Sequence, residues 1–185
     1  MSIDSSVHPD VSRAPREVTL EKRVIVVYDL ASFTRAAQGR DAIEVWAFLE
    51  DYYALCGDLI GGAGGRVVKF VGDACLAIFP PERCVEAVDA MTRLRAALPA
   101  VATRHRLPVS SGHANVHLAT IAAGELGPPG LRRFDIIGEG VNHTFLMGGR
   151  LGPGVHVSEP VYRQLPNERR GAWRKQKPPS TYSLG

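Results

Sequence analysis

Short apolar runs alternate along this chain with longer amphipathic segments. The run "RVIVVYDL" at 23–30 is apolar almost throughout, which is typical of a central strand. From Asp41 to about Ile60, apolar residues recur at helical spacing, and "GGAGG" then ends the predicted helix. The segment "RVVKFVGDACLAIF" predicts two strands joined by a tight turn at Gly72-Asp73.

The second half of the chain predicts one long helix and several short strands. "PERCVEAVDAMTRLRAAL" has Pro81 in its first turn and runs amphipathic to Leu98, which predicts a helix. Strands are predicted at 109–118, 120–124, 133–137 and 155–158, with a last one in "STYSL" and short helices in "GEGVNHTFLM" and "EPVYRQL". This order predicts an α/β or α+β fold with a mixed central sheet flanked by helices.

Composition narrows the class of protein. The 185 residues fit one domain, predicted at 21–185, and the polar, Pro-containing residues 1–20 are expected to form a flexible arm. A net charge of +3 is too small to indicate a nucleic-acid partner. No apolar run is long enough to span a membrane, so no membrane partner is expected. Three cysteines without metal-ligand spacing, and no signal peptide, predict a reduced, cytoplasmic protein.

Two aspartates lie where a predicted strand ends or turns. Asp29 follows "VIVVY", and Asp73 lies in the predicted hairpin turn, where Asp is also common for purely structural reasons. If adjacent strands bring the two carboxylates together, they repel each other unless a cation lies between them. Such a pair suits a hard ion such as Mg²⁺ or Mn²⁺. The following "ASFT" offers backbone N–H groups and the Thr34 hydroxyl to a polyphosphate.

Several motifs together resemble one known family. "VYDLASFT", "GGRVVKFVGDACLAIF" and "RFDIIGEGVN" occur in the order found in class III nucleotidyl cyclase catalytic domains, whose ferredoxin-like sheet is flanked by helices. "NVHLATIAAGELG", "PGVHVSEPVYRQL" and "WRKQKPPSTYSL" are also similar to family segments, although Asn115 and Ala119 stand where the family has Gly. The resemblance covers roughly Arg23 to Leu184.

The resemblance implies a metal and phosphate site. Asp29 and Asp73 match the two metal-binding aspartates, and the backbone carbonyl of Leu30 matches a further metal ligand. Two Mg²⁺ or Mn²⁺ ions per active site are therefore implied. Phe33 and Thr34 match residues beside the triphosphate.

The resemblance also implies residues that select the substrate. Lys69 and Asp135 match the pair that reads the base, with the Lys–Asp combination selecting adenine. Asn142 matches the residue that orients the ribose. Lys175 or Lys177 falls where the family places a phosphate-binding Lys, within a loop that aligns loosely.

Ordinary structural roles stand beside these assignments. Lys69 could extend from an edge strand into solvent, and Asp135 could pair with Arg132 or Arg133. Asn142 could be the N-terminal cap of a helix formed by "HTFLM".

The sequence departs from the family pattern at one position that is expected to affect catalysis. Leu146 stands four residues after Asn142, where the family has an Arg that stabilises phosphate charge. Losing one donor of that kind costs on the order of 10²–10³ in rate, so a slow enzyme is expected unless another Arg substitutes. The candidates are Arg132, Arg133 and Arg150, and His113 stands near a position where Arg is frequent.

The resemblance implies a phosphorus–oxygen lyase that converts ATP to 3′,5′-cyclic AMP and pyrophosphate. It also implies a head-to-tail homodimer with the active sites at its interface. One subunit would supply Asp29 and Asp73, and the other Lys69, Asp135 and Asn142. The alternatives are a guanylate cyclase, a pyrimidine cyclase that makes cUMP or cCMP in antiphage defence, and a weak or inactive nucleotide-binding dimerisation module.

Overall fold

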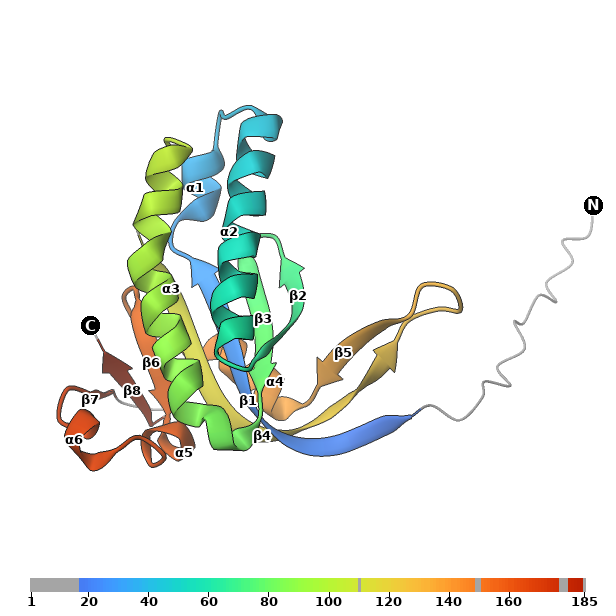
Figure 1. The fold of residues 1–185 in the computed structure, drawn as a ribbon, viewed down its shortest axis with the longest axis vertical. Coiled ribbons are helices and arrows are strands. Elements are labelled where there is room, and N and C mark those ends of the chain that lie inside the picture. Colours follow the sequence, from blue (N-terminus) through green and yellow to red (C-terminus); the bar gives the residue numbers. More distant parts are fainter. Residues whose placement is uncertain (1–16, 110, 149–150, 177–179, 185) are drawn as a thin grey trace, which may run out of the picture.

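An eight-stranded mixed sheet forms the centre of the molecule (Figure 1). The computed structural model describes residues 17–109, 111–148, 151–176 and 180–184. The strands follow the order β2-β3-β1-β4-β6-β8-β7, and β5 pairs with β4 beside this path. Only the β4–β6 pair is parallel among the strand pairs of these residues. The strands are β1 (Val18–Leu30), β2 (Arg66–Val71), β3 (Ala74–Phe79), β4 (Gly112–Leu126), β5 (Arg133–Ile137), β6 (Gly154–Ser158), β7 (Arg174–Gln176) and β8 (Thr181–Leu184).

Two long helices, α2 and α3, lie side by side over one face of the sheet (Figure 1). The shorter helices α1 and α5 bury Ala36 and Val161 in the same core as α2 and α3, and α4 packs on the opposite face of the sheet. The helices are α1 (Phe33–Ala37), α2 (Ala42–Gly62), α3 (Cys84–Arg104), α4 (Glu139–Leu146), α5 (Glu159–Tyr162) and α6 (Asn167–Arg170), with a 3₁₀ turn at Pro81–Arg83. The expected mixed sheet flanked by helices is therefore confirmed.

Alternation along β1 builds two separate cores. Val24, Val26 and Tyr28 point toward α2 and α3, the helical face of the sheet. Ile25 and Val27 point to the opposite side, which we call the open face. Helix α4 covers part of the open face, and its Val141 packs into the apolar cluster of that face. The open face therefore keeps room for polar side chains and for a ligand.

Strands β1, β4 and β5 extend beyond the helices as a projecting arm (Figure 1). Two sequence predictions were wrong here. A single strand, β4, replaces the two predicted at 109–118 and 120–124, because Ala119 pairs with Arg23 inside an unbroken ladder. Residues 18–20, predicted to be flexible, belong to β1 because Val18 pairs with Gly124.

Helix α3 is longer than its pattern predicted. It continues past Leu98 to Arg104 even though Pro99 lies inside it. Val101 and Ala102 beyond the proline are buried, so packing compensates for the hydrogen bond that proline cannot donate. The short elements α1, α6 and β7 were not predicted, because three to five residues are too few to show a period.

Candidate active site

Adjacent strands bring Asp29 and Asp73 into one neighbourhood. Asp29 lies near the end of β1, and Asp73 lies in the β2–β3 turn; β1 and β3 pair up to Tyr28 and Cys75. Burial raises the pKa of both aspartates, and the charge of Asp29 raises the pKa of Asp73 further. The backbone at Leu30 and at Asp73 itself favours the ionised form of the Asp73 carboxyl and so lowers its pKa. The nearby His113 partly offsets the rise at Asp29.

The donor set around these carboxylates fits a hard cation. Asp29 is exposed and Asp73 is partly buried, and the charge of Asp29 makes ionisation of Asp73 more costly, so a positive charge between the two carboxylates would favour their ionised forms. Within the described parts of the chain, no group of three or more His, Cys, Asp or Glu side chains could hold a metal alone. Water and substrate oxygens would have to complete the coordination, as is usual for Mg²⁺.

Two tyrosines of α2 hold the turn that carries Asp73. The Tyr52 hydroxyl donates to the Asp73 carbonyl (3.1 Å), and the Tyr53 hydroxyl donates to the Gly72 carbonyl (2.5 Å). Gly72 adopts φ +58°, a left-handed conformation that favours glycine. The predicted turn at Gly72-Asp73 is therefore confirmed, and its backbone is anchored to a helix.

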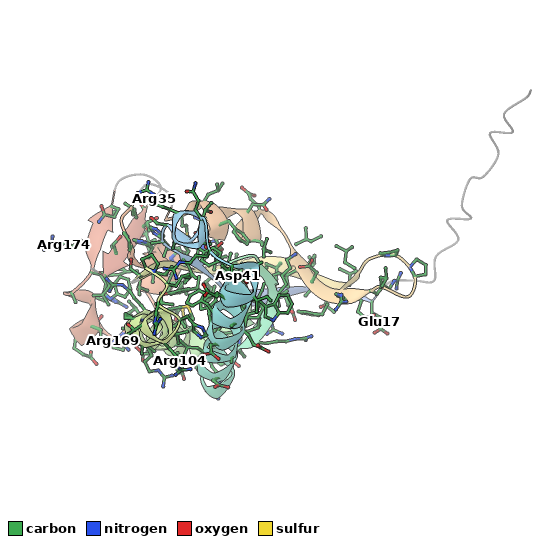
Figure 2. The ribbon with its side chains drawn as sticks, turned by 90° about the horizontal axis from the view of Figure 1, so that it is seen from above. Glu17, Arg35, Asp41, Arg104, Arg169 and Arg174 are labelled. Atoms are coloured by element: carbon green, nitrogen blue, oxygen red, sulfur yellow. The ribbon has the colours of Figure 1, made fainter. Side chains whose placement is uncertain are left out.

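Helix α1 forms a cavity of about 840 Å³ beside Asp73. Phe33 and Thr34, which the sequence associated with a triphosphate, line it together with Asp73. Arg35 lines the same cavity and adds a cation that the sequence analysis did not single out. Figure 2 shows Arg35 on α1, at the upper edge of that view.

Lys69 and Asp135 form a direct ion pair. The Lys69 Nζ donates to an Asp135 carboxylate oxygen at 2.6 Å, and the other oxygen accepts from the Ile136 N–H at 2.8 Å. Asp135 is therefore paired with Lys69, and neither Arg132 nor Arg133 forms an ion pair with it among the contacts described. A lysine of β2 and an aspartate of β5, far apart in sequence, thus present a donor and an acceptor at one place.

Helix α4 carries Asn142, the residue predicted to orient the ribose. It begins at Glu139 with Gly138 as its N-cap, so the interpretation of Asn142 as a helix cap is wrong. Asn142 is exposed, and Leu146, one turn further on, is 78% exposed. An exposed Leu146 is not part of the core.

The loop expected to bind phosphate places its cations on two faces. Arg174 and Gln176 of β7 line a cavity of about 660 Å³ together with Ser183. Lys175 instead pairs across the strands with Tyr182, and its Nζ lies 5.9 Å from the Tyr182 ring centre. The structure therefore does not bring Lys175 into this cavity, and Lys177 lies outside the described residues. Alternation along β7 puts Arg174 and Lys175 on opposite faces, and the pairing with β8 decides which of them faces the cavity.

Comparison with known proteins assigns the chain to a family. The family model for the adenylate and guanylate cyclase catalytic domain matches residues 18–177, so the chain belongs to this family of class III cyclases. It is 27% identical over 154 residues to the adenylate cyclase of Anabaena cylindrica, covering 78% of this chain and 31% of that protein. The chain spans a third or less of the length of the first curated relatives it matches.

Two solved structures share the fold. The adenylyl cyclase CyaB from P. aeruginosa superposes with a TM-score of 0.79 at 17% identity, covering 91% of this chain and 96% of that one. The guanylyl cyclase Cya2 gives 0.76 at 18% identity, covering 89% and 91%. Among the helices that the structure describes, none is long and apolar enough to cross a membrane.

Proposed function

We propose that residues 21–185 form a catalytic domain that converts ATP to 3′,5′-cyclic AMP and pyrophosphate. The observation that carries the choice of base is the Lys69–Asp135 pair at 2.6 Å. Lys69 can donate to a ring nitrogen of adenine, and Asp135 can accept from its exocyclic amine. A guanine edge reverses these polarities and would leave both groups without a matching partner on the base, and sites of this kind discriminate through such mismatches.

Asp29 and Asp73, with the Leu30 carbonyl, would hold two Mg²⁺ or Mn²⁺ ions. When bound, such ions activate the ribose hydroxyl and neutralise the phosphates of the leaving group. The chain's own residues position the substrate: Phe33 and Thr34 lie beside Asp73 in the α1 cavity.

A head-to-tail homodimer would complete each site. Lys69 and Asp135 line neither the α1 cavity with Asp73 nor the cavity with Asp29. Asn142 is exposed on α4, on the open face. These positions support a site in which one copy supplies the carboxylates and the other supplies the base-reading pair and Asn142.

Arg174, in place of Lys175, is our candidate for the cation that binds a phosphate. Its cavity on β7 supports this choice, and Lys175 provides a matched control because it is the next residue along the strand. Arg174→Gln should raise KM for the nucleotide on the order of 10-fold, the value of one charge-assisted hydrogen bond. Lys175→Gln should leave KM unchanged; equal effects of the two substitutions would reject the choice.

A weak or inactive module is the second candidate, and the exposed Leu146 favours it. Product analysis after incubation with each of the four nucleoside triphosphates and Mn²⁺ tests both functions, with Asp73→Ala as the inactive control. Cyclic AMP as the main product supports the proposal. A guanine or pyrimidine cyclic nucleotide would reject the assignment of Lys69 and Asp135, and no product at all would favour the inactive module.

A further inference from the structure

A second polar cavity, of about 330 Å³, lies on the open face beside Asp29. Phe145 in the last turn of α4 and Gly148 just after the helix close one side of it. Its walls combine a small apolar surface with three polar side chains on neighbouring strands. The lining residues are Val27, Asp29, Ala74, His113, Asn115, Phe145 and Gly148.

Asn115 is the unusual member of this set. The residue is only 4% exposed, and its Oδ1 is buried with no hydrogen-bond partner among the residues that the structure describes. Leaving a carboxamide oxygen in that state costs about 1–3 kcal/mol. The two ends of a carboxamide have nearly the same shape, so a half-turn exchanges Oδ1 and Nδ2 within the same space. Asn115 can therefore present either a donor or an acceptor to the cavity.

His113 adds a second unsatisfied atom. Its Nδ1 is also buried without a partner in the described chain. Residues 113 and 115 share one face of β4, and His113 stands directly across from Asp29 in the β1–β4 ladder. Two unsatisfied polar atoms thus border the same cavity as a carboxylate assigned to metal binding.

The neighbouring backbone is built around the Asn115 side chain. A Cβ atom on Gly148 would lie 2.5 Å from the Asn115 Oδ1, so a larger residue at 148 would have to displace the carboxamide. The close fit indicates that the carboxamide has a fixed place in the fold.

We propose that Asn115 and His113 bind water molecules in the hydration shell of a divalent cation held by Asp29. This inference rests on the proposed metal site. Hard cations such as Mg²⁺ keep several waters, and water both donates and accepts, so it satisfies the Asn115 carboxamide and the His113 nitrogen in either orientation. At about 30 Å³ per molecule, a cavity of about 330 Å³ has room for several waters.

The test uses Mn²⁺ alone as the probe, titrated into the full chain by calorimetry and followed in parallel by thermal unfolding. Asn115→Ala removes the carboxamide, and should weaken Mn²⁺ binding about 10- to 100-fold, the usual effect of losing an outer partner of a metal site. Ser158→Ala is the matched control, because the Ser158 hydroxyl is also buried without a described partner but does not line this cavity. It should leave the Mn²⁺ affinity unchanged.

Two further variants separate the possible failures. Asp29→Asn should abolish Mn²⁺ binding; if binding persists, or wild-type protein binds no Mn²⁺, the metal site itself is rejected along with this inference. If Asp29→Asn abolishes binding and Asn115→Ala binds as wild type, the inference alone is rejected. Asn115→Ser, which keeps a water-binding hydroxyl, should recover part of the affinity and guards against a folding defect in the alanine variant.

Pulsed electron paramagnetic resonance of the bound Mn²⁺ supplies a readout independent of affinity. Water between the ion and the two side chains predicts proton couplings from the hydration shell and no coupling to a directly bonded nitrogen. Direct ¹⁴N coordination, lost in His113→Gln, would overturn the proposal, because His113 would then be a metal ligand itself.

Discussion

Protonation of His117 should destabilise the protein in mildly acidic solution. His117 lies on β4 under α4, its ring centre is 4.8 Å from that of His143, and its Nδ1 is buried without a partner among the described residues. Burial, and secondly the charge of His143, lower the pKa of His117 from 6.5 to about 4. The folded protein therefore holds this ring neutral at a pH at which the unfolded chain protonates it.

The sign of the effect follows from proton linkage. Between the folded pKa of about 4 and the unfolded value of 6.5, the unfolded state binds more protons, so the free energy of unfolding rises with pH. The contribution is complete above pH 6.5 and is lost as the pH falls toward 4. A gap of this size corresponds to about 3.4 kcal/mol. Because the ring is only partly buried, solvent screening reduces the expected value to about 1–2 kcal/mol.

Urea unfolding of wild type and His117→Gln, followed by circular dichroism between pH 7.5 and pH 4.5 at one protein concentration, measures this contribution. Wild type should lose about 1 kcal/mol more than the variant between pH 7 and pH 5. His143→Gln removes the repulsive neighbour and should make the wild-type slope shallower. Parallel pH profiles for wild type and His117→Gln would refute the reasoning, because the lost stability would then come from other groups.

Three further predictions concern the active site. Asp29→Ala and Asn142→Ala should each be inactive, yet after mixing should recover roughly a quarter of wild-type activity, because half the dimers are mixed and one site in two is then intact; proven mixed dimers that stay silent would reject the shared site. Lys69→Glu with Asp135→Cys should lower ATP turnover and raise GTP turnover in a cyclase assay, and unchanged ATP turnover would show that these residues do not read the base. Leu146→Arg should raise kcat more than it changes KM, up to the order of 10²-fold, since the contact forms mainly in the transition state; a folded variant without gain would mean that another cation, such as Arg35, already serves.

Local pattern was sufficient for the main elements of the fold. The apolar run of β1 predicted a buried strand, and helical spacing predicted α2. The spacing did not identify the buried face of α2, because Ile43 and Trp46 are exposed. The turn at Gly72-Asp73 was predictable because its backbone needs a residue without Cβ. The motifs around Asp29, Asp73 and Lys69 were sufficient to indicate the cyclase family, which the family match confirms.

Relations between distant segments required the tertiary structure. The sequence could not show that Lys69 and Asp135 form an ion pair, since 66 residues separate them and only the sheet brings β2 near β5. The sequence could not choose between Arg174 and Lys175 as the phosphate-binding cation. Which of the two side chains faces the cavity depends on the register of a three-residue strand. The burial of Asn115 was equally hidden: its polarity favours the surface, and only β1, β6 and the end of α4 closing around β4 remove it from water.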